Sequence, residues 1–558
     1  MRNKLIGRVS ATEKVPTTMD SFTFWTNSDF RLHAFDIVKV EHIDGSFTFG
    51  AVKNISHITD AQSFLTNYIS NDFGKPETES PTLRIGINYA EATVSFNTKN
   101  IYTPVHNDAP VYLASQSEIM QALGLDKIQN PIVCGSIIMY EGTEDEITIP
   151  VHMNSKFILG PEGAHLNISG ISGLAAKTSY SMFLMKAIQE HYIRTQDNND
   201  SIAFVIFNVK GRDLMAIDRP DSNLPECERR KYQELGLSAK PFRNVRYYIP
   251  FTKHNSALAS YLPREDIESY IGSGQLMRFK YCYENDRESL DMLFTNIDDP
   301  LQTMDSILSK IIDKSDSDFG NIHEWKDFID TVDTLSQNSK AAGRNPGEIT
   351  VQSWRKFKRI INKTIKNDDM FAPRLAEGRH DCRLADELKH IRANDVRVID
   401  IAKLTEDKQA FVFGDALRAI YNLKLGEYDD EGVSPPSRII IFVDELNKYA
   451  SKDTSKNSPV LRELLDVTER GRSLGIILFG AEQFRSSIHP RVTGNCAVHA
   501  YGRTSTIETS SKDYSHFPDT YRNILSRLEQ GEYLIQSPIF RTLLRIKFPR
   551  PVYRQFNE

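Results

Sequence analysis

The sequence predicts an α/β protein with a mostly parallel sheet, preceded by a small β-barrel and interrupted by a helical insertion. After residue 150, apolar strand-like runs alternate with helical patterns, which is typical of parallel βαβ units. Before residue 150, short strand-like runs are separated by turn residues, a pattern that favours a barrel. Between about 255 and 395 helical segments replace the strands. We therefore expect an N-terminal barrel over 1–150 and an α/β core over 151–558, with the insertion inside the core.

Composition narrows the class of protein. The chain has 558 residues, which exceeds one compact core, and its 40% hydrophobic and 25% charged residues are ordinary for a globular protein. The net charge of −6 is unlike that of a protein whose outer surface is coated with nucleic acid. Any contact with DNA must then be local, for instance inside a ring.

The five cysteines are widely spaced, and their spacing disfavours a disulfide framework or a zinc site. The basic residues at the N-terminus are not followed by an apolar run, so we expect no signal peptide. No apolar stretch approaches the roughly 20 residues of a transmembrane helix. We expect a cytoplasmic protein that does not enter a membrane.

The strand-like runs divide into two groups. Those of the predicted barrel alternate apolar and polar residues, whereas those of the core are more continuously apolar, as in a sheet covered on both faces. The barrel runs are 4–9, 22–25, 36–40, 47–52, 83–89 and 92–96, and the core runs are 165–169, 202–209, 245–249, 396–401, 438–443, 475–479 and 497–501.

A candidate phosphate-binding loop lies between the strand 165–169 and a predicted helix from about Thr178 to Arg194. Small residues let the backbone curl so that its N–H groups point at phosphate oxygens, and the helix N-terminus adds positive charge. Lys177 would reach the β- and γ-phosphates of ATP, and Thr178 would bind Mg²⁺. The residues assigned to nucleotide binding are Gly170, Ser172, Gly173, Leu174, Ala175, Ala176, Lys177, Thr178 and Ser179.

The loop departs from the usual pattern G-x-x-x-x-G-K-[ST], because Ile171 and Ala176 stand where glycine is usual. Taken alone, the segment is equally well interpreted as a glycine-containing turn with an incidental lysine.

A pair of acidic residues strengthens the phosphate-loop interpretation. Asp444 and Glu445 directly follow the apolar strand 438–443, and α/β sheets bind ligands at the carboxyl ends of their strands. Asp444 would hold Mg²⁺, and Glu445 would polarise the attacking water. The alternative is a strand that simply enters solvent through acidic residues.

Two further elements fit a nucleotide-hydrolysing site. Gln483 follows the strand that begins at Gly475 and could contact the γ-phosphate or the water; alone, it would be a surface glutamine. Arg470 and Arg472 stand near the end of a predicted helix, where they would serve the site of a neighbouring subunit. Equally, they would complement the dipole of their own helix.

Together these residues resemble the HerA/FtsK group of hexameric P-loop ATPases, and HerA most closely. The resemblance rests on four segments: 6–9, 157–178, 398–404 and 469–475. It implies a RecA-like core, a HerA-type barrel, and ATP hydrolysis between the subunits of a homohexamer, with Arg472 the better candidate for the trans-acting residue. It also implies movement of double-stranded DNA with a partner nuclease or a sirtuin-type NAD-consuming effector, as in bacterial antiphage systems.

Three hypotheses stay open at this point: a DNA-moving motor, a nucleotide-regulated ring scaffold that activates an effector, and a P-loop kinase. The kinase hypothesis explains neither the arginines nor the barrel.

Within the insertion, residues 354–366 form an amphipathic pattern with basic residues on its polar face. We interpret it as a surface helix with a solvated face, and a DNA- or partner-binding helix is the alternative.

Overall fold

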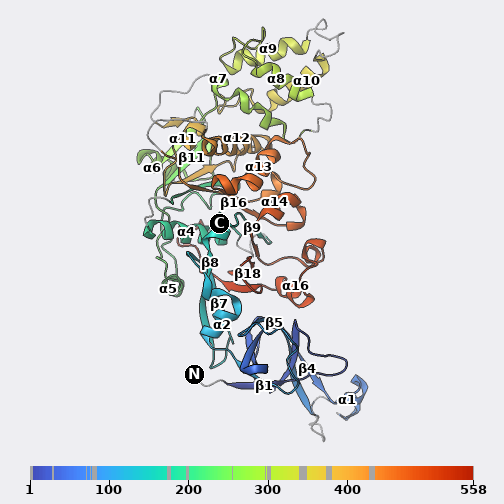
Figure 1. The fold of residues 1–558 in the computed structure, drawn as a ribbon. Coiled ribbons are helices and arrows are strands. Elements are labelled where there is room, and N and C mark those ends of the chain that lie inside the picture. The colour runs from blue at the N-terminus through green and yellow to red at the C-terminus, as the bar shows by residue number, and fades with distance from the viewer. Residues whose placement is uncertain are drawn as a thin grey trace. The chain divides into compact units, whose positions relative to one another are not determined.

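The structure is a computed structural model, shown in Figure 1. It describes residues 4–27, 30–70, 72–75, 77, 85–171, 177–195, 200–253, 256–295, 297, 303–337, 349–372, 380–426 and 434–556. The chain divides into two compact units, one of residues 1–154 and 503–548 and the other of residues 155–502 and 549–558. Residues 503–548, which the sequence analysis assigned to the α/β core, thus group with the N-terminal segment.

The first unit contains a closed six-stranded antiparallel barrel in the order β1-β2-β5-β4-β3-β6. A second, antiparallel set of strands, β18-β19-β7-β8, includes residues from both ends of the chain. The elements are β1 (Leu5–Val9), β2 (Ser21–Thr26), β3 (Ile37–His42), β4 (Ser46–Thr59), α1 (Phe64–Ser70), β5 (Gly86–Asn97), β6 (Pro110–Leu113), α2 (Gln116–Leu123), β7 (Pro131–Met139), β8 (Ile147–Asn154), α15 (Thr506–Thr509), α16 (Asp519–Leu525), β18 (Glu532–Gln536) and β19 (Leu544–Lys547).

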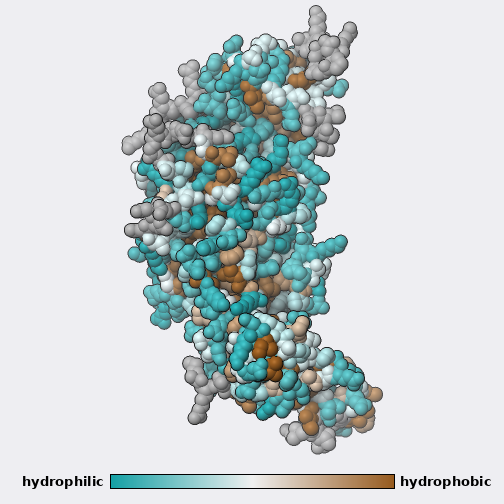
Figure 2. Space-filling model, in the orientation of Figure 1, coloured by the Kyte–Doolittle hydropathy of each residue, from teal (hydrophilic) through white to brown (hydrophobic). Residues whose placement is uncertain are grey.

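The predicted barrel is therefore present, and it is smaller than 1–150, because it closes with β6 at Leu113. Residues 86–89 and the run 92–96 belong to one long strand, β5, which pairs with the long strand β4; residues 83 and 84 of the first run lie outside the described residues. Beyond β4, the helix α1 exposes apolar side chains such as Phe64, and apolar residues are visible on the surface of the first unit in Figure 2.

The second unit contains the α/β core, and its helices and strands alternate as the sequence predicts. They are α3 (Ser155–Ile158), β9 (Leu166–Ser169), α4 (Lys177–Thr195), β10 (Ile202–Asn208), α5 (Glu226–Glu234), β11 (Val245–Pro250), α6 (Arg264–Gly272), β12 (Leu276–Phe279), α7 (Tyr283–Asp286), α8 (Thr303–Ile312), α9 (Trp325–Gln337), α10 (Val351–Thr364), β13 (Asp381–Cys382), α11 (Leu384–Lys389), β14 (Val396–Asp400), α12 (Glu406–Leu425), β15 (Arg438–Val443), α13 (Pro459–Leu474), β16 (Ile476–Glu482), α14 (Pro490–Asn495) and β17 (Val498–Tyr501).

The strands of this unit form a parallel sheet in the order β13-β12-β11-β14-β10-β15-β16-β9-β17. Every residue of β10 is buried, which is expected of a strand covered on both faces. The helix α13 ends at Gly475, whose φ of +74° favours glycine, and the chain then enters β16. This turn makes α13 run antiparallel to β16.

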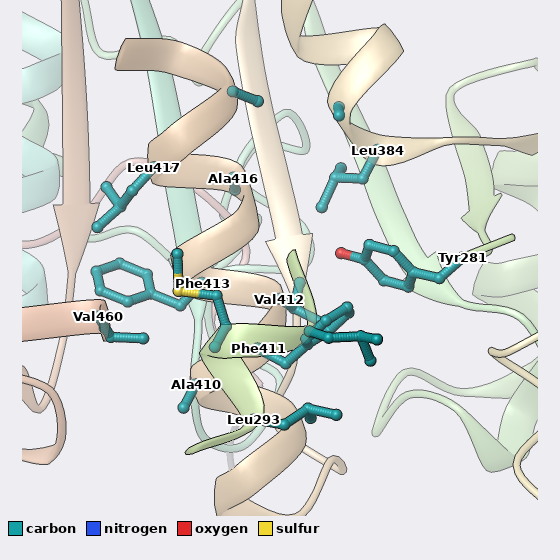
Figure 3. Close-up of a cluster of buried hydrophobic side chains, with 14 of the residues drawn as sticks. Tyr281, Leu293, Leu384, Ala410, Phe411, Val412, Phe413, Ala416, Leu417 and Val460 are labelled. Carbon is teal, nitrogen blue, oxygen red and sulfur yellow. The ribbon is translucent and has the colours of Figure 1, made fainter. Parts of the chain in front are cut away.

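The helical insertion is present, with one correction. Within 255–395 the chain also forms β12 and β13, which pair with each other at the edge of the sheet beyond β11. The helices of the insertion share one buried cluster with the sheet and with α12 and α13. Figure 3 shows part of this cluster, where Tyr281 and Leu293 lie on the side of α12 that carries Phe411. The insertion is therefore packed into the core.

The amphipathic pattern at 354–366 corresponds to α10. Its apolar residues Trp354, Phe357, Ile361 and Ile365 are buried in the same cluster. Two of its cations pair with acidic residues of the same unit: Lys358 with Asp333 at 3.1 Å and Lys363 with Asp407 at 2.5 Å. The helix thus has a structural role, and part of its charge is used locally.

Among the residues that the structure describes, none of the helices combines the length and the apolar character needed to cross a membrane.

Candidate nucleotide-binding site

Three neighbouring strand ends form the candidate site. The strands β15, β16 and β9 are parallel and adjacent, so their carboxyl ends lie at one edge of the sheet. Asp444 follows β15, Gln483 follows β16, and Gly170 follows β9. The backbone N–H of Gly170 donates a hydrogen bond to the carbonyl oxygen of Glu482 at 3.1 Å, which ties the start of the predicted phosphate loop to β16.

The helix α4 begins at this edge and brings the predicted lysine and threonine to the acidic strand end. Thr178 Oγ1 donates a hydrogen bond to Asp444 Oδ2 at 3.0 Å, and Asp444 is only 3% exposed. Lys177 is 4% exposed, and burial lowers its pKa below the usual value for lysine, although the charge of Asp444 acts in the opposite direction. Ser179 lies in the same helical turn, and Ser172, Gly173, Leu174, Ala175 and Ala176 lie outside the described residues.

Glu445 has a strained backbone, with φ 60° and ψ 44° in the left-handed region. Such a conformation costs a residue other than glycine about 1–3 kcal/mol and is concentrated at functional sites. Its backbone N–H donates to Asp444 Oδ1 at 2.9 Å, and this bond fixes the orientation of the Asp444 carboxylate.

The nearest cation to Glu445 is one that the sequence analysis did not select. Lys210 Nζ donates to Glu445 Oε1 at 2.9 Å and lies 3.5 Å from Asp444 Oδ2. Burial by itself would raise the pKa of Glu445, but the hydrogen bond and charge of Lys210, together with the charge of Lys177, lower it below the usual value. Glu445 is therefore an anion at neutral pH in this arrangement.

A buried carboxyl group, that of Glu482, lies beside the phosphate-loop strand. Asn167 of β9 donates its amide Nδ2 to Glu482 Oε1 at 2.8 Å and accepts a bond from Arg485 Nη1 at 2.7 Å. Glu482 is 0% exposed, and burial raises its pKa to about 8. The amide of Asn167 thus links β16, β9 and the turn that carries Arg485.

Gln483 is half-buried next to Glu482, at the edge of the sheet where the sequence analysis placed it. The two arginines lie elsewhere. Arg470 pairs with Asp466 on its own helix at 3.8 Å, and Arg472 Nη1 donates to the carbonyl oxygen of Glu162 at 3.4 Å. Both stand at the C-terminal end of α13, which adjoins the amino end of β16.

The length of β16 separates these arginines from the carboxylates of the same chain. Its seven residues span about 23 Å at roughly 3.3 Å per residue. An arginine side chain cannot cover that distance, so Arg470 and Arg472 do not serve the site of their own chain.

The donor set at the edge suits a hard divalent cation bound together with phosphates. Thr178 and Asp444 offer a hydroxyl and a carboxylate oxygen that already lie within hydrogen-bonding distance of each other. Mg²⁺ prefers such oxygen ligands and takes its remaining ligands from water and substrate phosphates. In the described part of the chain no group of three or more His, Cys, Asp or Glu is placed to hold a metal, so a site made of protein ligands alone is not indicated there.

Sequence reasoning missed Lys210, Asn167 and Glu482. Lys210 lies two residues beyond the apolar strand β10, near the strand end as Asp444 is at β15, so a search of the residues after each apolar strand would have selected it. Glu482 was passed over in favour of Gln483, because sequence alone does not tell which of two polar residues at a strand end is buried.

The strand order and the contact between α4 and β15 define the class of fold. One strand, β16, lies between β9, which leads into the candidate phosphate loop, and β15, which ends in the acidic pair. With α4 beginning directly after the loop, this is the RecA-like P-loop ATPase fold that the sequence predicts.

Comparison with family models and with curated proteins finds no match. Among solved structures, the chain is similar to the bacterial conjugative coupling protein TrwBΔN70, with 9% identity, a TM-score of 0.42 and coverage of 73% of this chain and 90% of that one. Plasmid coupling protein TrwB with the ATP analogue ADPNP gives 10% identity, a TM-score of 0.40 and coverage of 71% and 87%. The packaging NTPase B204 of Sulfolobus turreted icosahedral virus 2 gives 15% identity, a TM-score of 0.22 and coverage of 29% of this chain and 71% of that one. Similarity at this level assigns no activity to the chain.

Proposed function

We propose that the chain is a Mg²⁺-dependent ATPase of the HerA/FtsK group that hydrolyses ATP between the subunits of a homohexameric ring. The observation that carries the proposal is the hydrogen bond from Thr178 to Asp444, which joins the first turn of α4 to the acidic end of β15. A hydroxyl at a helix N-terminus next to a strand-end carboxylate is the pair of ligands that P-loop ATPases use for Mg²⁺.

Each residue of the site has a defined task in this proposal. Lys177 binds the β- and γ-phosphates, assisted by the N–H groups at the start of α4. Thr178 and Asp444 would hold Mg²⁺, which, when bound, neutralises charge on the phosphates. Glu445 orients the attacking water and accepts its proton, and Gln483 donates a hydrogen bond to the γ-phosphate or the water.

The position of the two arginines supports hydrolysis between subunits. Neither reaches the site of its own chain, so a role in catalysis requires a neighbour, and a closed ring provides one for every site. Because of its match to the HerA segment, Arg472 is the first candidate, and Arg470 is the second.

Lys177→Ala is expected to lose nucleotide binding, because the ammonium group that neutralises the β- and γ-phosphates is removed. Titration of a fluorescent ATP analogue with Mg²⁺ should show an affinity at least about tenfold weaker than that of the wild type. Lys240→Ala, which removes an exposed lysine of the same unit, serves as the control and should bind normally. Equal affinity for the Lys177 variant and the control would remove Lys177 from the site.

The proposal extends to the biological role of the ring. We propose that it is a cytoplasmic motor that moves double-stranded DNA for a partner nuclease or NAD-consuming effector in antiphage defence. None of the five cysteines, which all lie in the described part of the chain, forms a disulfide, and this is compatible with a reducing compartment. The alternative is a nucleotide-regulated scaffold that activates an effector without moving DNA, which the net charge of −6 and the locally paired cations of α10 favour.

One experiment separates these two roles. For a motor, double-stranded DNA should raise the rate of ATP hydrolysis severalfold, and the ring should displace a DNA-bound roadblock in an ATP-dependent manner. For a scaffold, the ATPase rate should be indifferent to DNA and respond instead to the effector protein. Loss of the DNA effect in Glu445→Gln rings controls for displacement by binding alone.

A further inference from the structure

Lys210 lies against the acidic residues of the candidate site, although the proposed function gives it no role. Its ammonium group lies 2.9 Å from Glu445 Oε1 and 3.5 Å from Asp444 Oδ2, and Thr178 Oγ1 donates to that same Asp444 oxygen. The two carboxylates of the candidate site therefore already face a cation, and that cation belongs to the chain.

The fold holds Lys210 in this place. The strand β10 lies next to β15 in parallel, with Phe207 level with Val443, so the residues after β10 stand beside the residues after β15. Asn208 anchors the turn, because its Nδ2 donates to Gly211 O at 3.0 Å and to Asp400 Oδ1 at 2.8 Å. Gly211, with φ +60°, permits the tight turn that follows Lys210.

The buried end of this anchor is firmly bound. Asp400 is fully buried and accepts hydrogen bonds from Ser260 Oγ at 2.5 Å and from the N–H of Ala402 at 3.2 Å. The backbone at Lys210 is therefore fixed, while its side chain is 47% exposed and can swing away from the carboxylates without disturbing the core.

Charge balance explains why the site needs such a group. Asp444 and Glu445 place two carboxylates within reach of one ammonium group, and like charges repel each other in a partly buried site. Lys210 compensates them. A divalent cation bound to Thr178 and Asp444 would compensate them equally well and would repel the ammonium group.

We propose that Lys210 is an internal counter-ion of Asp444 and Glu445 and that it is displaced when Mg²⁺-ATP binds. The inference rests on the proposed function, since it assumes that Mg²⁺-ATP binds at this edge. A counter-ion at this place has two effects on binding, and they act in opposite directions. Lys210 competes with Mg²⁺ for the carboxylates, and it attracts the phosphates of ATP when Mg²⁺ is absent.

The test uses Lys210→Met, which keeps the length of the side chain and removes its charge, with Lys456→Met as the control at an exposed lysine of the same unit. Binding of a fluorescent ATP analogue is measured with Mg²⁺ and with a chelator. We expect the Lys210 variant to bind the Mg²⁺ complex more tightly and metal-free ATP more weakly. The dissociation constant for metal-free ATP divided by that for Mg²⁺-ATP should rise at least about tenfold relative to the wild type.

A second readout needs no nucleotide. MgCl₂ alone should raise the melting temperature of Lys210→Met, because its carboxylates lack a counter-ion, and should leave that of the wild type nearly unchanged. Lys210→Arg, which keeps the charge, should resemble the wild type; Lys210→Gln provides a polar substitute if the methionine variant does not fold. An unchanged ratio and an unchanged response to MgCl₂ in a wild type that binds Mg²⁺-ATP would overturn the counter-ion assignment alone. A wild type that binds no nucleotide would instead overturn the proposed function.

Discussion

Glu445→Gln is expected to bind Mg²⁺-ATP about as tightly as the wild type and to lose turnover by roughly 10²–10⁴-fold, the range for removal of a general base. The amide keeps the size of the side chain, and Asp444, which would hold Mg²⁺, is untouched. What disappears is the anionic oxygen that accepts the proton of the attacking water. Phosphate release under saturating ATP measures the loss, and binding of a fluorescent ATP analogue measures the retained affinity.

Glu268→Gln provides the matched control for this prediction. Glu268 is an exposed carboxylate of α6 in the same unit, where it pairs with Arg264, and its amide variant should hydrolyse ATP normally. If Glu445→Gln turns over at the rate of this control, Glu445 is not the residue that activates water.

Arg472→Ala is expected to lose about 10³-fold or more of its turnover while it keeps its affinity for ATP, by analogy with other trans-acting arginines. Such an arginine stabilises charge that develops in the transition state, so its removal slows the reaction and affects the bound ground state little. Arg462→Ala, at an exposed arginine in the first half of α13, is the control and should be active.

Mixing subunits tests whether Arg472 acts on a neighbour. Arg472→Ala and Glu445→Gln rings are each inactive, but a mixed ring contains sites that combine an intact Glu445 with an intact Arg472 from the adjacent chain. These rings should regain part of the activity. Light scattering must first show hexamers, since a chain that stays monomeric at every concentration contradicts the ring itself. If mixed rings form and remain inactive, Arg472 is not the trans-acting residue and Arg470 is tested in the same way.

The sequence predicts much of the fold, because its signals are local. The apolar runs of β10, β15 and β16 are long and end in polar residues or turns, so their positions follow from pattern alone. The strands β12 and β13 have four and two residues, too few for a periodic pattern, and they were missed within the predicted helical insertion. The apolar face of α10 was visible, whereas its partners Asp333 and Asp407 come from other segments and were not.

The candidate site shows the same limit. Asp444 and Lys177 could be selected from sequence, because each stands at the end or start of a recognisable element. The local pattern of apolar residues does not predict the order of strands in the sheet. That order places β10 next to β15 and β16 next to β9. The contacts that depend on this order, of Lys210 with Glu445 and of Glu482 with Asn167, therefore emerge only from the structure.

The central claim is that Mg²⁺-ATP binds where α4 meets β15, and it is tested most directly by an experimental structure of the Glu445→Gln protein with Mg²⁺ and ATP. The account predicts the triphosphate against the N-terminus of α4, with Lys177 at its terminal phosphates and Mg²⁺ in contact with Thr178 and on the Asp444 side of the site. Lys210 should have left its position beside the carboxylates of Asp444 and Glu445. A nucleotide bound elsewhere on the chain, or phosphates at this edge with Lys177 and Thr178 uninvolved, would contradict it.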